Sequence, residues 1–275
     1  MTKFIPRDKL EHLIWKPADA LPTSKQQPAP AQPPQSTAAL EGSYILMDQT
    51  DTYAKGVHAL RKASQKYTAS PHPTFTKSDG SQIYRPLTFK EVIQARVTDY
   101  NTLLDEEGNE RTLEGRLRFF KKWIDSCTGM AYKANTTKFK LINVCPELIT
   151  ISKGFNDNFL SINYDSVTGI ELDSSKGKYD ESLTKKEVIN HKAWLAAVEE
   201  DKVLLKEYCD IVFDQLKKKY GRDTGIGFYF FDVGEDDELR ALFVDSLNNN
   251  SNAGGFSYLN LSGSFLLVAP SREKK

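Results

Sequence analysis

The sequence predicts an α+β protein with a helical front portion, a mainly antiparallel sheet of short strands, and one long helix over about residues 192–220. Three observations support this class. Apolar residues recur at helical spacing over residues 50–124, short apolar runs alternate with turn formers after residue 129, and helical spacing returns over 192–220. Helices and strands that occupy separate stretches of a chain are typical of α+β proteins.

Composition and charge narrow the possible partners. The 275 residues are 39% hydrophobic, which is enough to form the core of one large domain. The 37 basic and 37 acidic residues cancel, so the whole chain does not favour nucleic acid or an anionic membrane surface. The longest apolar runs are too short to span a bilayer, so we expect no membrane partner.

We expect residues 1–40 to form a docking peptide and a linker, followed by a single α+β domain over 41–275. Seven of the twelve prolines fall between Pro6 and Pro34, among many Ala, Gln, Ser and Thr residues. Such a composition buries too little apolar surface to offset the entropy of ordering the chain. The stretch therefore predicts an extended linker.

The peptide before this linker has the pattern of a short amphipathic helix. Asp8 and Glu11 have N-cap and N3 spacing, and Pro17 ends the run. A helix of fewer than about 12 residues is rarely stable alone in water. We therefore expect the peptide to dock on a partner protein or a neighbouring subunit, with a frayed terminus as the alternative. The candidate anchors are Leu10, Leu13, Ile14 and Trp15.

Helical spacing predicts three helices in the front portion, over about 50–66, 88–104 and 113–124. Thr88 and Glu91 form a capping box at the start of the second helix. The acidic turn 106–109 separates the last two helices, so we expect them to form an αα-hairpin. Leu104 and Leu113 belong to their apolar faces.

Short apolar runs predict strands over 139–144, 148–152, 159–164, 227–233, 239–244 and 258–268. A second capping box, Thr184 with Glu187, marks the start of the longest helix. Apolar positions at steps of three and four run from 195 to 216, and Gly221 ends this helix.

Cysteine residues give one enzymatic hypothesis. Cys127 is the most plausible nucleophile, with His191 and Asp125 as participants in a site assembled by tertiary contacts. However, the expected position of Cys127 at a helix C-terminus disfavours a thiolate, so the favoured interpretation is a small buried side chain that closes the helix. Whether the chain is an enzyme stays open. Three widely spaced cysteines are typical of reduced thiols, so we expect a cytoplasmic location.

Metal and cofactor motifs are not recognisable, so we expect neither. No Cys-x-x-Cys pair occurs, and the charged residues with helical spacing, such as Glu187 and His191, are typical of solvated helix faces. Gly225 and Gly227 follow a helix and lead into a strand, which reverses the order that a nucleotide-binding loop requires.

A basic stretch over 111–140 gives a further alternative, a module that binds phosphate or nucleic acid. The candidate phosphate-binding residues are Arg116, Arg118, Lys121 and Lys122. Aromatic residues interleave with them, as in single-strand-binding surfaces. The neutral total charge disfavours nucleic acid. The leading hypothesis is therefore a non-catalytic interaction or assembly protein that uses its N-terminal arm.

Overall fold

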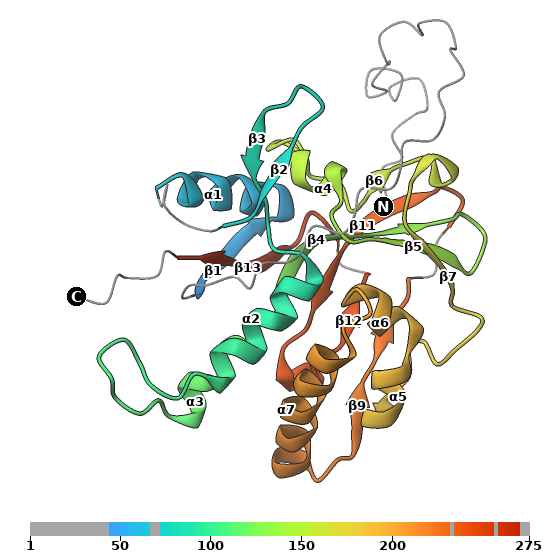
Figure 1. The fold of residues 1–275 in the computed structure, drawn as a ribbon. Helices are drawn as coiled ribbons and strands as arrows, with labels where there is room; N and C mark the ends of the chain where they lie inside the picture. The colour runs from blue at the N-terminus through green and yellow to red at the C-terminus, as the bar shows by residue number, and fades with distance from the viewer. Residues whose placement is uncertain (1–43, 67–71, 232–233, 256–257, 270–275) are drawn as a thin grey trace, which may run out of the picture. The chain divides into compact units, whose positions relative to one another are not determined.

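The structure, a computed structural model, describes residues 44–66, 72–231, 234–255 and 258–269. It confirms the α+β class (Figure 1). The helices are α1 (Tyr53–Gln65), α2 (Phe89–Asn101), α3 (Leu113–Arg116), α4 (Pro146–Thr150), α5 (Lys185–Asn190), α6 (Lys192–Ala197) and α7 (Lys202–Tyr220), with 3₁₀ turns η2 (Tyr164–Ser166) and η3 (Leu247–Asn249). No helix within these described ranges is long and apolar enough to cross a membrane.

The main sheet is mixed but mostly antiparallel. Its longer strands are β1 (Tyr44–Thr52), β4 (Ile124–Tyr132), β5 (Lys138–Ile142), β11 (Glu238–Val244) and β13 (Ser262–Val268). Its shorter strands are β6 (Leu160–Ser161), β7 (Ile170–Asp173), β10 (Phe228–Tyr229) and β12 (Ala253–Gly254). The strand order is β1-β13-β4-β11-β12-β10, while β5 joins β4 to β7 and β6 pairs with β11. Among the described strands of this sheet, only the pairs β13–β4 and β10–β12 are parallel.

Two further pairs of strands lie outside this sheet. β2 (Thr74–Thr76) pairs with β3 (Gln82–Tyr84), and β8 (Leu183–Thr184) pairs with β9 (Thr224–Ile226). The second pair positions α5, which follows β8 directly and contacts α7.

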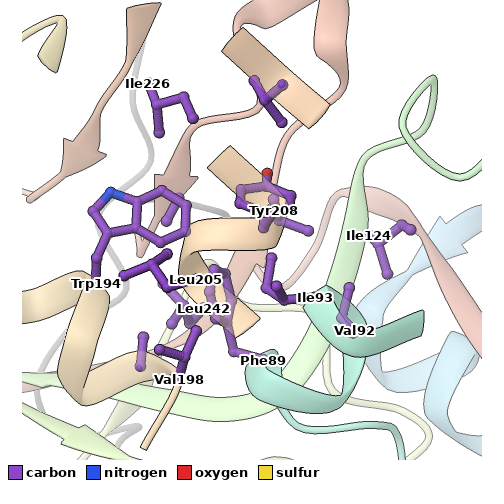
Figure 2. Packing of buried hydrophobic residues seen from close by; sticks show 14 of the residues in the cluster. Phe89, Val92, Ile93, Ile124, Trp194, Val198, Leu205, Tyr208, Ile226 and Leu242 are labelled. Atoms are coloured by element: carbon purple, nitrogen blue, oxygen red, sulfur yellow. The ribbon is translucent and has the colours of Figure 1, made fainter. Parts of the chain in front are cut away.

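Each face of the main sheet has its own apolar core, because side chains alternate along each strand. In β11, Leu242 and Val244 belong to the core that the buried side chains of α2, α6 and α7 complete, including Trp194 (Figure 2). Leu239 and Ala241 face the other core, which the buried residues of α1 and α4 complete. The sheet therefore lies between two helical layers.

Helix ends follow the capping signals in the sequence. The Thr88–Glu91 capping box is present at α2, and the Thr184–Glu187 box is present at α5. Gly221 ends α7 in the left-handed conformation, with φ at 64°. Side chains that satisfy free backbone groups at helix ends thus fix where these helices begin and end.

The second helix of the expected hairpin is much shorter than its periodicity predicts. α3 ends at Arg116, and turns follow until Ile124 begins β4. Phe119 and Phe120 are both fully buried, so the segment packs on more than one side. All nine residues of β4 are buried as well, so this strand lacks the alternation by which strands are recognised.

The expected long helix over 192–220 is wrong as a continuous element. The chain forms α5, α6 and α7 in succession, and the second capping box begins only the six-residue α5. Glu199 and Glu200 adopt left-handed φ values of 55° and 62°, and the Asp201 side chain then caps α7. Glutamate is a good helix former, so the sequence gives no sign of this break.

One expected strand is a helix in the structure, and one strand of the structure was not expected. Residues 148–152 lie largely in α4, which begins with Pro146 at its first helical position. Proline is favoured there because its missing N–H would have no helical partner. β1 was not expected at all, although it pairs with β13 over most of its length.

Candidate functional site

The predicted partner-binding anchors lie outside the described residues. Leu10, Leu13, Ile14 and Trp15 therefore stay a prediction from sequence. The division of the chain at residue 40 also stays a prediction, because residues 1–43 precede the first described residue.

Cys127 lies in the middle of β4, which corrects its expected position at the end of a helix. Between the pairs Asp125–Phe243 and Gly129–Ala241, β4 contains two more residues than β11, so it bulges here. The bulge turns backbone groups toward other segments. The Cys127 amide donates to the carbonyl of Leu87 at 2.9 Å, and the Cys127 carbonyl accepts from the Cys145 amide at 3.0 Å.

The surroundings of Cys127 disfavour a nucleophilic thiolate. Its side chain is fully buried, and the thiol donates to the carbonyl of Pro86 at 3.1 Å. Burial raises the pKa of the Cys127 thiol to about 12, although the nearby Arg85 guanidinium acts in the opposite direction. Arg85 is already paired with Glu91 at 2.7 Å. A thiol with this pKa stays protonated and unreactive at neutral pH.

The two other residues of the enzymatic hypothesis have different surroundings. Burial raises the pKa of the Asp125 carboxyl to about 7, and the indole Nε1 of Trp123 donates to it at 3.0 Å. His191 packs edge-to-face against Tyr179 with ring centres 4.8 Å apart. The contact of His191 with Tyr179 involves no partner of Cys127 or Asp125, so the described contacts do not assemble the three side chains into one site.

The four candidate phosphate-binding residues all have partners within the chain. The Arg116 guanidinium donates to the Tyr100 carbonyl, and Arg118 pairs with Asp99 at 2.6 Å. Lys121 pairs with Glu114, and Lys122 pairs with Asp48 at 3.0 Å. These contacts neutralise much of the positive charge that a phosphate would need.

Metal-binding groups do not converge in the described part of the chain, where no set of three His, Cys, Asp or Glu side chains could hold an ion. Glu187 and His191, which have helical spacing in the sequence, are an example of side chains that do not form a metal site. Glu187 instead accepts from Lys178 at 2.5 Å and from the Thr184 amide at 2.8 Å.

The turn between α2 and α3 presents an exposed apolar surface that the sequence did not reveal. Leu103, Leu104 and Leu113 are 57%, 54% and 46% exposed. Leu104 and Leu113 were expected on buried helix faces, but α2 ends at Asn101 and α3 has only one turn, so the packing of these two helices leaves both side chains exposed. We call these three residues the leucine surface. Large apolar side chains that a fold leaves exposed are candidates for interaction sites.

Hydrogen bonds hold this turn in one conformation. The Arg111 amide donates to the Leu103 carbonyl at 2.7 Å, and its guanidinium donates to the Asp99 carbonyl at 2.8 Å. Within the turn, the Asp105 carboxylate accepts from the amides of Glu107 and Asn109. The leucine surface therefore lies on a preorganised support, which lowers the entropy lost on binding.

Comparisons with known proteins leave the family open. No family model matches the chain, and no curated protein matches it. A solved structure, described as the accommodation of massive sequence variation in Nanoarchaeota by the C-type lectin fold, has a TM-score of 0.49 at 15% identity. The match covers 84% of this chain and 99% of that one. At this level of similarity it carries no inference about the present protein.

Proposed function

We propose that this protein is a non-catalytic interaction or assembly protein in which the N-terminal arm of one copy docks on the leucine surface of a neighbouring copy. The observation that carries the proposal is the exposure of Leu103, Leu104 and Leu113 on a hydrogen-bonded turn. The arm supplies matching anchors in Leu10, Leu13, Ile14 and Trp15. Burying apolar side chains from both partners contributes about 25 cal/mol per Å² before ordering costs.

Charge complementarity supports this choice of occupant. Residues 3–16 of the arm contain four basic and two acidic residues. The turn over 105–110, which adjoins the leucine surface, contains four acidic residues and no basic one. Opposite local charges speed association and orient the partners even when the total charge of the chain is zero.

The length of the linker also supports docking on another copy. Residues 17–39 number 23, and a proline-rich chain extends by about 3.1 Å per residue, which gives a reach of about 70 Å. A linker of this length is not needed to dock on an adjacent surface of the same domain.

Buried thiols support a cytoplasmic location for this function. Cys127, Cys145 and Cys209 are all free and buried. Burial raises the pKa of the Cys209 thiol to about 12, as it does for Cys127. Reduced structural cysteines are typical of proteins in a reducing compartment.

The proposal predicts that the protein associates through both surfaces. Sedimentation equilibrium of the full chain should give a mass above that of the monomer. Deleting residues 1–40, or combining Leu103→Ser with Leu104→Ser, should weaken association at least about tenfold, because each removes apolar contacts worth more than about 1.4 kcal/mol. Far-UV circular dichroism should stay unchanged in the described α+β body.

Val203→Ser is the matched control, because this apolar residue of α7 is 70% exposed and lies outside the leucine surface. It should leave the association constant unchanged. A full chain that stays monomeric up to high micromolar concentration would contradict assembly between copies. Equal weakening by Val203→Ser would show that the leucine surface has no special role.

A further inference from the structure

A cleft beside Tyr179 has the size and lining of a small-molecule site. It consists of two adjoining pockets of about 340 and 250 Å³, which share Lys176, Tyr179 and Lys192. The larger pocket extends to α5 and His191, and the smaller one extends to β5 and β7. Volumes of this order accommodate small organic ligands.

Tyr179 forms an apolar wall at the junction of the two pockets. Its half-buried ring packs edge-to-face against His191 and against Phe139, with centroids 4.8 and 5.7 Å apart. Gly177 lies against the same ring, since a Cβ atom at this position would be only 3.0 Å from Tyr179 Cε2. These contacts fix the ring where a flat apolar group can pack on it.

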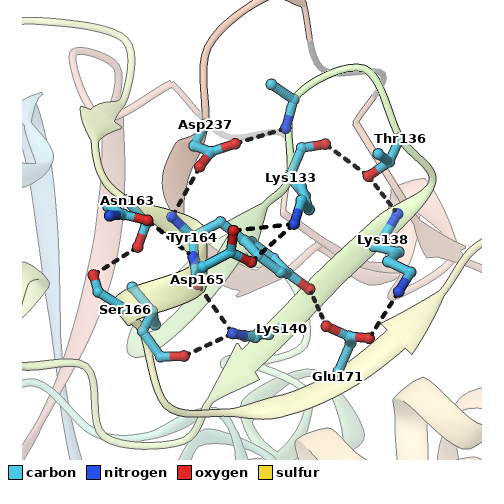
Figure 3. Close-up of polar contacts among 12 residues, drawn as sticks. Lys133, Thr136, Lys138, Lys140, Asn163, Tyr164, Asp165, Ser166, Glu171 and Asp237 are labelled. Atoms are coloured by element: carbon cyan, nitrogen blue, oxygen red, sulfur yellow. Dashed lines mark hydrogen bonds and ion pairs between the residues drawn. The ribbon is translucent and has the colours of Figure 1, made fainter.

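A polar network holds the outer wall of the cleft in place (Figure 3). The Glu171 carboxylate of β7 accepts from Lys138 at 3.2 Å and from the Tyr164 hydroxyl at 3.1 Å. Lys140 of β5 donates to the carbonyls of Tyr164 and Val167 at 3.0 and 2.8 Å. The wall is therefore formed before any ligand binds.

The charges around the cleft leave one lysine without a carboxylate. Lys138, Lys176 and Lys178 pair with Glu171, Asp173 and Glu187 respectively. Hydrogen bonds lower the pKa values of the Asp173 and Glu187 carboxyls to about 2, so both stay ionised at neutral pH. Lys192 has no ion-pair partner among the described residues, which leaves the cleft with one net positive charge.

His191 adds an unused hydrogen-bonding atom. The side chain is 9% exposed, and its Nδ1 atom is buried with no hydrogen-bond partner in the described structure. Burial lowers the pKa of the imidazole to about 4, while a hydrogen bond to the Lys178 backbone acts in the opposite direction. The ring is therefore neutral at pH 7, and Nδ1 is left as an acceptor.

We propose that the Tyr179 cleft binds a small hydroxylated organic anion with a flat apolar part. Its carboxylate or phosphate group pairs with Lys192, and its flat part packs on Tyr179. Because Nδ1 of His191 is buried in the unliganded protein, the imidazole must turn toward the cleft before the ligand hydroxyl can donate to this atom. The site lies on residues that take no part in the arm docking proposed above, so the two proposals stand or fall separately.

Isothermal titration calorimetry of the full chain tests this site with 4-hydroxybenzoate as the carboxylate probe and 4-hydroxyphenyl phosphate as the phosphate probe. At least one should bind with one-to-one stoichiometry. Benzoate, which lacks the hydroxyl, and neutral 4-hydroxybenzyl alcohol should each bind at least about tenfold more weakly, since each loses one partner. The stronger of the two anions identifies the preferred headgroup.

Lys192→Gln should weaken binding of the anionic probe at least about tenfold, because it removes a charge-assisted hydrogen bond. Lys186→Gln is the matched control, an exposed lysine of the neighbouring α5 that does not line the cleft. It should change the dissociation constant by less than about twofold. No binding of either anion at 20 mM, or equal affinity in Lys192→Gln and the wild type, would overturn the proposal.

Discussion

At the scale of single residues, the buried carboxyl of Asp125 is the clearest conflict between a side chain and its surroundings. It lies in β4 with a pKa that burial raises to about 7, although the hydrogen bond from the Trp123 indole acts in the opposite direction. The absence of a side chain at Gly263 makes room for it, because a Cβ there would lie 1.7 Å from Asp125 Oδ2. Burying an ionised carboxylate is costly, so this residue lowers stability at alkaline pH.

Asp125→Asn should therefore stabilise the protein at pH 8. A carboxyl whose pKa rises from 3.8 to about 7 on folding supports the folded state below pH 3.8, and that support is lost as the pH rises to 7. The stability of Asp125→Asn relative to the wild type should thus increase by on the order of 3 kcal/mol between pH 4.5 and pH 8. Urea unfolding at several pH values measures this difference.

Asp51→Asn provides the comparison, since this exposed carboxylate pairs with Lys55 and its pKa is lowered. Its effect on stability should be small at both pH values. If the difference in unfolding free energy between Asp125→Asn and the wild type does not change with pH, ionisation of the buried Asp125 carboxyl does not destabilise the folded state.

At the scale of elements, helix ends were predictable where a capping side chain marks them and were missed where the backbone alone changes. Thr88 begins a helix as expected, and Thr184 also begins a helix, although a much shorter one than expected. The break between α6 and α7 depends on Glu199 and Glu200, whose left-handed conformation is unfavourable for residues with a Cβ. Their amides find partners in the preceding turn, for example Glu200 to the Leu195 carbonyl at 2.8 Å.

Glu200→Gly should stabilise the protein by about 0.5 kcal/mol, because glycine adopts a positive φ without steric cost. Glu207→Gly, in the interior of α7 and also exposed, should destabilise it by about 1 kcal/mol. Thermal or chemical unfolding measures whether each variant is more or less stable than the wild type. A continuous helix over 192–220 would instead make both substitutions destabilising by similar amounts.

At the scale of the whole molecule, two apolar cores share one sheet. Leu60 of α1 is fully buried in one core, and Leu205 of α7 is fully buried in the other. The strands between them contribute side chains to both cores. Neither core can therefore unfold without exposing apolar side chains of the sheet to solvent. This arrangement predicts that the described α+β body unfolds as one cooperative unit.

Leu60→Ala and Leu205→Ala should each lower the free energy of unfolding by about 2–5 kcal/mol, as expected for a cavity in a packed core. Circular dichroism and tryptophan fluorescence should report the same single transition in both variants. Trp194 lies in the same core as Leu205, so fluorescence follows that core directly when Trp15 and Trp123 are replaced by phenylalanine. Separate transitions, with fluorescence unaffected by Leu60→Ala, would mean that the two cores unfold independently.

Local chemistry in the sequence determined the α+β class, the mainly antiparallel sheet and several helix ends, because caps and alternating apolar residues act over a few neighbours. It also predicted the N-terminal arm, which stays a proposal. Periodicity marks an apolar face but not which element covers it. Only the tertiary structure therefore decided that Leu104 and Leu113 are exposed and that the buried Cys127 lies in a strand and not at a helix end. The same holds for the cleft around Tyr179, since β5, β7 and α5 come from distant parts of the chain and meet only on folding.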